Sequence, residues 1–112
     1  MTTAAPAWHA KRTEETRMVE QVLSQGGFDQ VDAYRYNAAS IRVRVIDRRF
    51  EGKPREVRDA MVEEYLDKLP PETQQDIVAL FTFAPSELAR TPMTFREFMQ
   101  NTEFDDPSPT ML

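Results

Sequence analysis

The sequence contains no cysteine, a single histidine and only three glycines among its 112 residues. Without cysteine, the chain forms no disulfide and offers no thiolate as a metal ligand or nucleophile. The single histidine, His9, lies in an N-terminal segment without hydrophobic periodicity. One imidazole there makes neither a metal site nor the base of a serine triad. We therefore expect a protein that is not an enzyme and holds no cofactor.

Long apolar segments are also missing. No run approaches the roughly 18–20 apolar residues that a membrane-spanning helix needs. The N-terminus, MTTAAPAWHAKR, lacks the apolar core of a secretory signal. The absence of cysteine is consistent with a reducing compartment. These features predict a cytoplasmic protein without a membrane partner.

Positive charge is scarce in the second half of the chain. Residues 1–50 carry eight Lys or Arg against six Asp or Glu, whereas residues 51–112 carry six against thirteen. The formal net charge is -5 at pH 7. An acidic chain is disfavoured as a non-specific nucleic-acid binder, although a local basic face could still bind.

The first periodic segment predicts a helix between Thr13 and Gly26. Thr13 is suited to cap it, and acidic residues follow in the first turn. The apolar residues between Met18 and Leu23 recur at helical spacing on one face. Gly26 and Gly27 then end the helix, because glycine takes the left-handed cap conformation without strain.

After Phe28 the hydrophobic period changes from helical to two. Residues 31–36 and 41–45 alternate in polarity and are joined by Asn37-Ala38-Ala39, which predicts an antiparallel hairpin. One side of this hairpin is apolar: Val31, Ala33, Ile41, Val43 and Val45. Because side chains alternate across a strand, we expect this face to be buried and the other to meet water.

The second half begins with a Pro-started helix. Pro54 suits the first helical position, and an apolar stripe follows from Val57 to Leu69, where Pro70-Pro71 ends it. Residues 77–83 form an apolar run that predicts a buried third strand. A helical turn is expected over residues 86–89. Thr94 could cap a short helix that carries Phe95, Phe98 and Met99.

These elements predict one α+β domain over residues 13–101, in the order α-β-β-α-β-α. Residues 1–12 are expected to be a disordered N-terminal tail, and residues 102–112 an acidic, proline-containing C-terminal tail. Three strands with helices on one face make a two-layer domain.

The passage around Phe50 resembles the BolA-like family. Phe50-x-Gly52 follows a strand, and Arg58 lies in the first turns of the next helix. The resemblance covers about residues 14–88. It implies a fold related to type II KH domains, with a mixed sheet whose third strand is parallel to a neighbour.

The sequence also departs from the family pattern. Asp47 stands where the family has serine, Arg58-Asp59-Ala60 replaces Arg-His-Arg, and Val78 replaces the histidine of the third strand. Family members pair with monothiol glutaredoxins and help to ligate a [2Fe-2S] cluster with that histidine and a His or Cys in the hairpin loop. Val78 cannot bind iron, and the loop Asn37-Ala38-Ala39 offers neither ligand. The resemblance therefore implies the fold without the cofactor.

The polar face of the hairpin is the first candidate binding site. It carries two aromatic and two guanidinium side chains: Tyr34, Tyr36, Arg42 and Arg44. Such a surface could stack bases and contact phosphates, or form a protein interface. Alternatively, the Tyr–Arg pairs only stabilise and solvate the sheet.

A second candidate surrounds the Phe50 turn, beside the N-terminus of the long helix. Its basic residues are Arg48, Arg49, Lys53 and Arg55. A helix N-terminus favours anions, so a phosphate could bind there. The alternative is a solvated basic turn paired with Glu51 and Glu56. The carboxylates of the following helix, from Glu56 to Asp67, are interpreted as a solvated face.

The sequence therefore predicts a small non-enzymatic BolA-like interaction or regulatory module. It would act through an exposed Tyr/Arg sheet face on a protein partner, as a monomer or weak homodimer. The alternative is a KH-like nucleic-acid-binding domain that uses the same arginines. Salt dependence separates the two, because binding through phosphates weakens steeply as salt is added.

Overall fold

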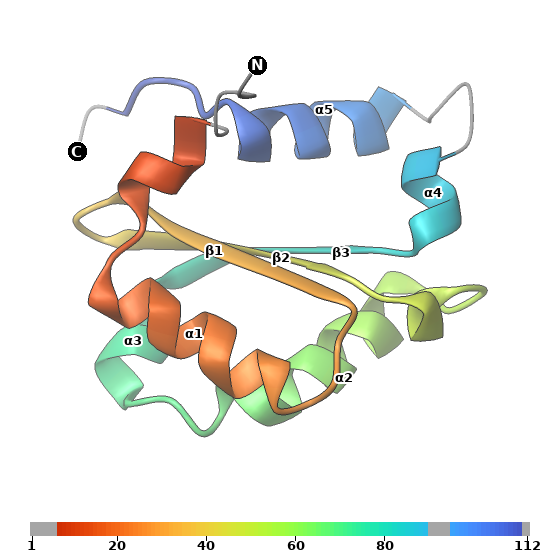
Figure 1. Cartoon of the computed structure of the whole chain (residues 1–112), viewed down its shortest axis with the longest axis horizontal. Helices are drawn as coiled ribbons and strands as arrows, with labels where there is room; N and C mark the ends of the chain where they lie inside the picture. The colour runs from red at the N-terminus through yellow and green to blue at the C-terminus, as the bar shows by residue number, and fades with distance from the viewer. Residues whose placement is uncertain (1–6, 90–94, 111–112) are drawn as a thin grey trace, which may run out of the picture.

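The computed structural model describes residues 7–89 and 95–110 of the chain (Figure 1). The elements follow in the order η1 (Ala7–Lys11), α1 (Glu14–Ser24), β1 (Gln30–Asn37), β2 (Ser40–Ile46), η2 (Arg48–Phe50), α2 (Arg55–Leu66), α3 (Pro71–Asp76), β3 (Ile77–Phe83), α4 (Pro85–Ala89) and α5 (Phe95–Asp105), where η denotes a 3₁₀ helix.

The three strands form one mixed sheet in the order β1-β2-β3. β1 and β2 are antiparallel, with Ala33 opposite Val43. β2 and β3 are parallel, with Val43 opposite Leu80. The long connection through α2 and α3 makes the parallel pairing possible. The expected α+β class, with a third strand parallel to its neighbour, is confirmed.

Helix α1 begins and ends as its sequence predicts, but its two glycines have different roles. The Thr13 side chain and Thr16 form a reciprocal capping box at its start. Gly27 has a φ of +73°, which favours glycine. A Cβ on Gly26 would lie 2.9 Å from ring atoms of Phe28 and Tyr65. Gly26 is therefore needed for close packing and Gly27 for backbone conformation.

The main core lies between the sheet and helices α1, α2 and α3, which cover one face (Figure 1). Most of its buried residues come from the predicted apolar sides of these elements, and Phe28, Phe50 and Ala84 come from the segments between them. The full set is Val19, Leu23, Phe28, Ala33, Ile41, Val43, Val45, Phe50, Val62, Leu66, Leu69 and Ala84. Val57, at the start of the α2 stripe, is an exception and is 43% exposed. The inward face of the hairpin is thus the predicted one.

The opposite face of the sheet is covered by η1 and α5 (Figure 1). Trp8 and Phe104 pack on Tyr34, with ring centroids 5.8 and 4.8 Å from that of Tyr34. All three side chains are buried. The prediction of helices on one face only is therefore wrong. The physical reason is that packing these large aromatic side chains together removes apolar surface from water. The folded state gains more free energy in this way than it would with Tyr34 on an open surface.

The predicted domain limits change accordingly. Residues 7–11 form η1 rather than part of a tail, and α5 extends to Asp105 rather than ending before residue 102. The sequence prediction also missed α3, in which Pro71 occupies the first turn. Thr94 and the side chains of Phe95 and Phe98 lie outside the described residues, whereas Met99 is 49% exposed.

Candidate functional site

The structure brings the four residues of the predicted Tyr/Arg face together. The Arg42 guanidinium lies 3.6 Å from the centroid of the Tyr36 ring and donates a hydrogen bond of 3.0 Å to the Tyr34 hydroxyl. Arg44 lies over Phe104, 4.4 Å from its ring centroid. Cross-strand Tyr–Arg packing is therefore present, as the alternative interpretation of this face expected.

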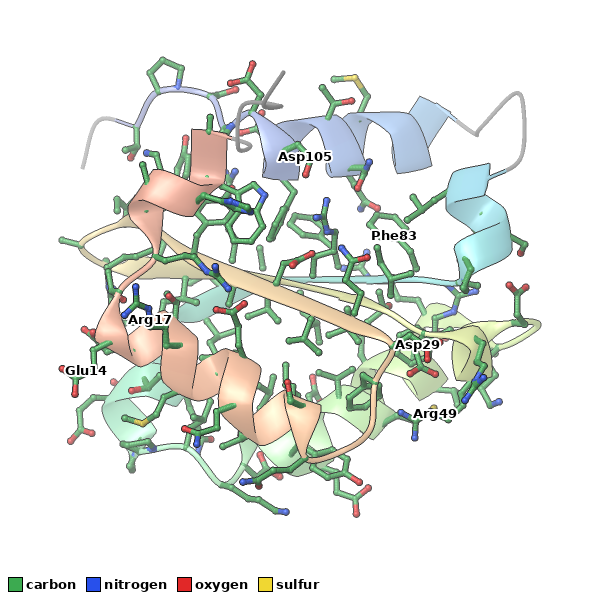
Figure 2. All side chains as sticks on the ribbon, in the orientation of Figure 1. Glu14, Arg17, Asp29, Arg49, Phe83 and Asp105 are labelled. Atoms are coloured by element: carbon green, nitrogen blue, oxygen red, sulfur yellow. The ribbon has the colours of Figure 1, made fainter. Side chains whose placement is uncertain are left out.

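These four side chains do not form an open surface. Arg42 Nη1 lies 3.1 Å from Glu103 Oε1, and Arg44 Nη1 lies 2.8 Å from Asp105 Oδ1. Asp105 lies on the side of α5 that faces the sheet (Figure 2). Tyr34 is fully buried, and Arg44 is 6% exposed. The expected exposure of this face is wrong, because α5 supplies carboxylates that pair with its arginines.

The chain after α5 extends this cover to the hairpin loop. Tyr36 donates a hydrogen bond of 2.7 Å from its hydroxyl to the Ser108 carbonyl oxygen. Asn37 Nδ2 donates to Thr110 Oγ1 at 3.0 Å. Residues 108 and 110, which the sequence analysis assigned to a tail, thus contact the hairpin directly.

Burial and pairing shift two pKa values beneath this cover. Burial raises the pKa of the Tyr34 hydroxyl, and the hydrogen bond from Arg42 only partly opposes the shift. Burial also acts to raise the pKa of Glu103, but hydrogen bonds from Ser108 and Arg42 outweigh it, so the pKa of Glu103 is lowered. Glu103 therefore stays ionised near neutral pH and holds Arg42.

Each of the basic residues around the Phe50 turn contacts a different group of the chain. Lys53 Nζ donates to the Arg49 carbonyl oxygen at 2.7 Å. Arg55 donates to the Leu80 carbonyl oxygen at 3.3 Å. Arg48 has an 84% exposed side chain, which lies 4.0 Å from Asp29. These contacts favour a solvated basic turn over an anion site, and the carboxylates in its ion pairs are Asp29, Asp47 and Asp59.

Asp47 organises this turn. Its carboxylate accepts hydrogen bonds from the backbone N–H groups of Asp29, at 2.9 Å, and Arg49, at 2.7 Å. Arg49 Nε donates a further bond of 2.8 Å to Asp47 Oδ1. The neighbouring Asp29 and Arg49 are visible in Figure 2. Asp47 is therefore a buried anchor between the starts of β1 and η2.

The β3 edge of the sheet presents a different surface. Val78 is 63% exposed and lies on an outer strand. It has no partner in the β2–β3 register, which passes from Ile41–Ile77 to Arg42–Ala79. The sequence predicted a buried third strand, so the exposure of Val78 is a finding of the structure. Val78 is the unpaired residue at this irregularity of the register.

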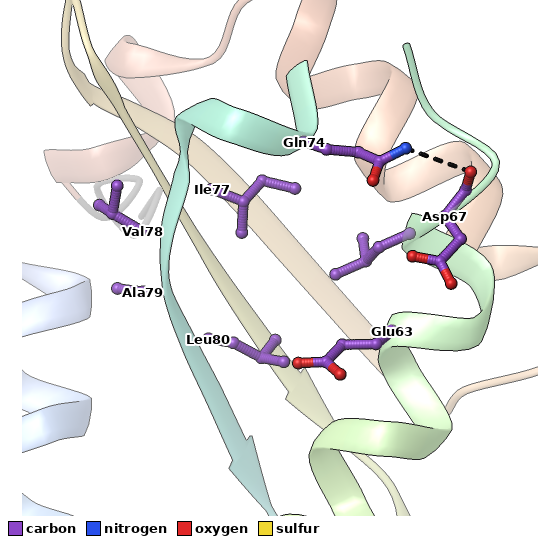
Figure 3. A pocket seen from close by; sticks show the side chains of 8 residues that line it. Glu63, Asp67, Gln74, Ile77, Val78, Ala79 and Leu80 are labelled. Carbon is purple, nitrogen blue, oxygen red and sulfur yellow. Dashed lines mark hydrogen bonds between the residues drawn. The ribbon is translucent and has the colours of Figure 1, made fainter. Parts of the chain in front are cut away.

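A cavity of about 300 Å³ lies beside this edge. Helix α2 contributes Glu63, Leu66 and Asp67, α3 contributes Gln74, and β3 contributes residues 77–80. Figure 3 shows Ile77 and Leu80 pointing from β3 toward α2, whereas Val78 and Ala79 point to the other side of the strand. Gln74 Nε2 donates to the carbonyl oxygens of Asp67 and Leu69, which joins α3 to the end of α2.

Comparison with known proteins adds a fold assignment. No protein-family model matches the sequence, and no curated protein is significantly similar to it. The solution structure of BolA1 from Mus musculus is similar to this chain, with a TM-score of 0.53 and 21% sequence identity. The similarity covers 100% of this chain and 85% of the mouse chain. The protein therefore has a BolA-like fold, as the Phe50 passage predicted.

Two further observations concern the described residues only. Within residues 7–89 and 95–110, no helix has the length and apolar content needed to cross a membrane. Over the same ranges, no three His, Asp or Glu side chains are grouped as a metal-ligand set would be.

Proposed function

We propose that this protein is a non-enzymatic, cytoplasmic module with a BolA-like fold that binds a partner protein through the β3 edge, centred on Val78. The exposure of Val78 on an outer strand is the observation that carries this proposal. An edge strand presents backbone N–H and C=O groups that an extended segment of another protein can pair with. The exposed apolar side chain adds a contact for that segment.

The resemblance to the BolA-like family supports the same location. Val78 occupies the strand position at which the family has its cluster-ligating histidine. Valine places an exposed side chain at this position and has no metal-binding chemistry. An apolar contact is then the interaction that the position can make.

The Tyr/Arg face is a weaker candidate for the binding site than the β3 edge. Tyr34 and Arg44 are buried, and both Arg42 and Arg44 are paired with carboxylates of α5. A nucleic-acid interface needs free cations to replace counterions on phosphates. With a net charge of -5, the chain favours a protein partner over a nucleic acid.

Affinity capture from native cell extract tests the proposal. The wild type is compared with Val78→Lys and with a matched control, Val57→Lys, which changes another exposed valine in the same way. We expect a protein that the wild type and the control retain and that Val78→Lys retains at least tenfold less. Both variants should unfold at nearly the wild-type temperature, because the changed side chains are exposed.

Two results would contradict the proposal. One is the recovery of every ligand with Val78→Lys. The other is the recovery of nucleic acid alone, with binding that falls steeply as salt is added, which would favour the KH-like alternative.

A further inference from the structure

We infer that the cavity between α2, α3 and β3 is a groove for a lysine or arginine side chain, carried by an extended partner segment that pairs with β3. This inference rests on the proposed function and specifies the chemistry of the partner. It is carried by three features of the groove, which are its unpaired carboxylates, its apolar floor and the open strand edge beside it.

The charge of the groove comes from Glu63 and Asp67. They are four residues apart on α2 and therefore lie on one face of the helix. Among the described residues, neither carboxylate makes a hydrogen bond or ion pair, whereas the nearby Asp59 pairs with Arg55 and Asp76 pairs with Arg35. The groove thus presents negative charge that the chain itself does not neutralise.

The floor of the groove is apolar. Leu66 is 6% exposed, and Ile77 and Leu80 are partly buried against the main core. Lysine and arginine place their aliphatic stems on apolar surface while their charged ends stay at its rim. Figure 3 shows the Glu63 carboxylate beside Leu80, so a stem on the floor would bring its charged end to a carboxylate. The volume of about 300 Å³ is at the lower end for ligand sites and suits one long side chain.

The strand edge explains how such a side chain would arrive. The carbonyl groups of Leu80 and Thr82 already accept hydrogen bonds from Arg55 and Arg58. Ala79 is paired with Arg42 of β2, whereas Val78 has no partner in the β2–β3 register. An extended segment can therefore pair at Val78. Its alternate side chains would point to opposite faces, so one packs on Val78 while its neighbour enters the groove.

Charge also selects among possible occupants. A second copy of this chain would place like-charged carboxylates near one another, and the chain has a net charge of -5. An acidic segment would be repelled by Glu63 and Asp67. A basic residue flanked by apolar residues matches all three features.

Selection from a random peptide library displayed on phage tests the inference with the full-length protein. Peptides selected on the wild type should be enriched in Lys or Arg next to β-branched apolar residues. Synthetic copies should bind Glu63→Gln/Asp67→Asn at least tenfold more weakly. The matched control is Glu56→Gln/Glu64→Gln, which removes two exposed carboxylates of α2 outside the groove and should change the Kd less than twofold. Backbone amide shifts on binding should centre on residues 77–80.

The outcomes separate this inference from the proposed function. Selected peptides without basic enrichment, equal binding by the two double variants, or a library that yields no binder would overturn the inference. If Val78→Lys still loses the native partner in these cases, the proposed function is retained and only the basic side chain in the groove is ruled out. Self-association that Val78→Lys abolishes would overturn the basic segment as occupant and assign the edge to a second copy.

Discussion

At the scale of single residues, Asp47 shows how one buried carboxylate can join separate segments. Its side chain is 1% exposed and accepts hydrogen bonds from Asp29 and Arg49. Burial acts to raise the pKa of Asp47, but hydrogen bonds from Arg49 and Asp29 outweigh it, and the pKa is lowered. The folded state therefore favours the ionised form.

This arrangement predicts a pH-dependent effect of Asp47→Asn. At pH 7 the variant should lose about 2–3 kcal/mol of unfolding free energy, because hydrogen bonds to a charged acceptor are weakened. The folded pKa lies below the unfolded value of about 3.9, so this stabilisation is complete above that value and is lost as pH falls through the folded pKa. Urea unfolding at pH 7 and at steps below pH 5 measures the difference.

The control for this experiment is Asp106→Asn, which changes an exposed carboxylate. It should alter stability by no more than about 0.5 kcal/mol. A difference between wild type and Asp47→Asn that stays constant down to the lowest pH would show that the charge of Asp47 does not stabilise the fold.

At the scale of elements, the outer layer formed by η1 and α5 depends on a few aromatic contacts. Phe104 is fully buried and packs on Trp8 and Tyr34, with ring centroids 5.3 and 4.8 Å away. Trp8 Nε1 is buried without a hydrogen-bond partner, which reduces the net gain from burying that ring. Phe104 is therefore the better residue with which to test this layer.

Phe104→Ala should destabilise the protein by about 3–5 kcal/mol, because it removes a fully buried ring and leaves a cavity. Chemical denaturation measures the change. Met99→Ala is the matched control on the same helix, since Met99 is 49% exposed, and should cost about 0.5 kcal/mol or less. Equal stability of the two variants would mean that α5 does not cover the sheet in solution.

At the scale of the whole molecule, the chain combines a BolA-like fold with a different set of potential ligands. The sequence has no cysteine, and valine stands at position 78, where the resemblance to the BolA-like family leads one to expect a histidine. His9 lies in η1, where its ring packs edge-on against Trp8 with centroids 4.3 Å apart. No residue of the hairpin loop can supply an imidazole or thiolate to a cluster.

We therefore expect the purified protein to be colourless and to contain no iron–sulfur cluster. Co-expression with a monothiol glutaredoxin should likewise give no cluster with the absorption spectrum of mixed cysteine and histidine ligation. Iron analysis and visible absorption measure the cluster content of both preparations. A coloured heterodimer that loses its spectrum in a His9→Ala variant would contradict the expectation and identify His9 as the ligand.

Much of the fold could be predicted from local sequence patterns. The alternation of Ile41, Val43 and Val45 predicted both β2 and its buried face, and the apolar run of residues 77–83 predicted β3. The short helix α3 was missed, because Pro70-Pro71 ends one helix and the second proline also starts the next. The β3 groove was missed with it, since α3 supplies one wall.

The sequence by itself determined most of the elements, the apolar side of the hairpin, and the absence of cysteine and of any histidine other than His9, because these depend on residue type and on spacing within a few positions. Only the tertiary structure decided which surfaces remain open. Alternating Tyr34, Arg42 and Arg44 satisfy the same pattern whether they face water or another helix. Arg44 and its partner Asp105 are 61 residues apart, so no local pattern reveals that the face is covered. The open edge at Val78 likewise depends on a register between strands that are distant in the chain.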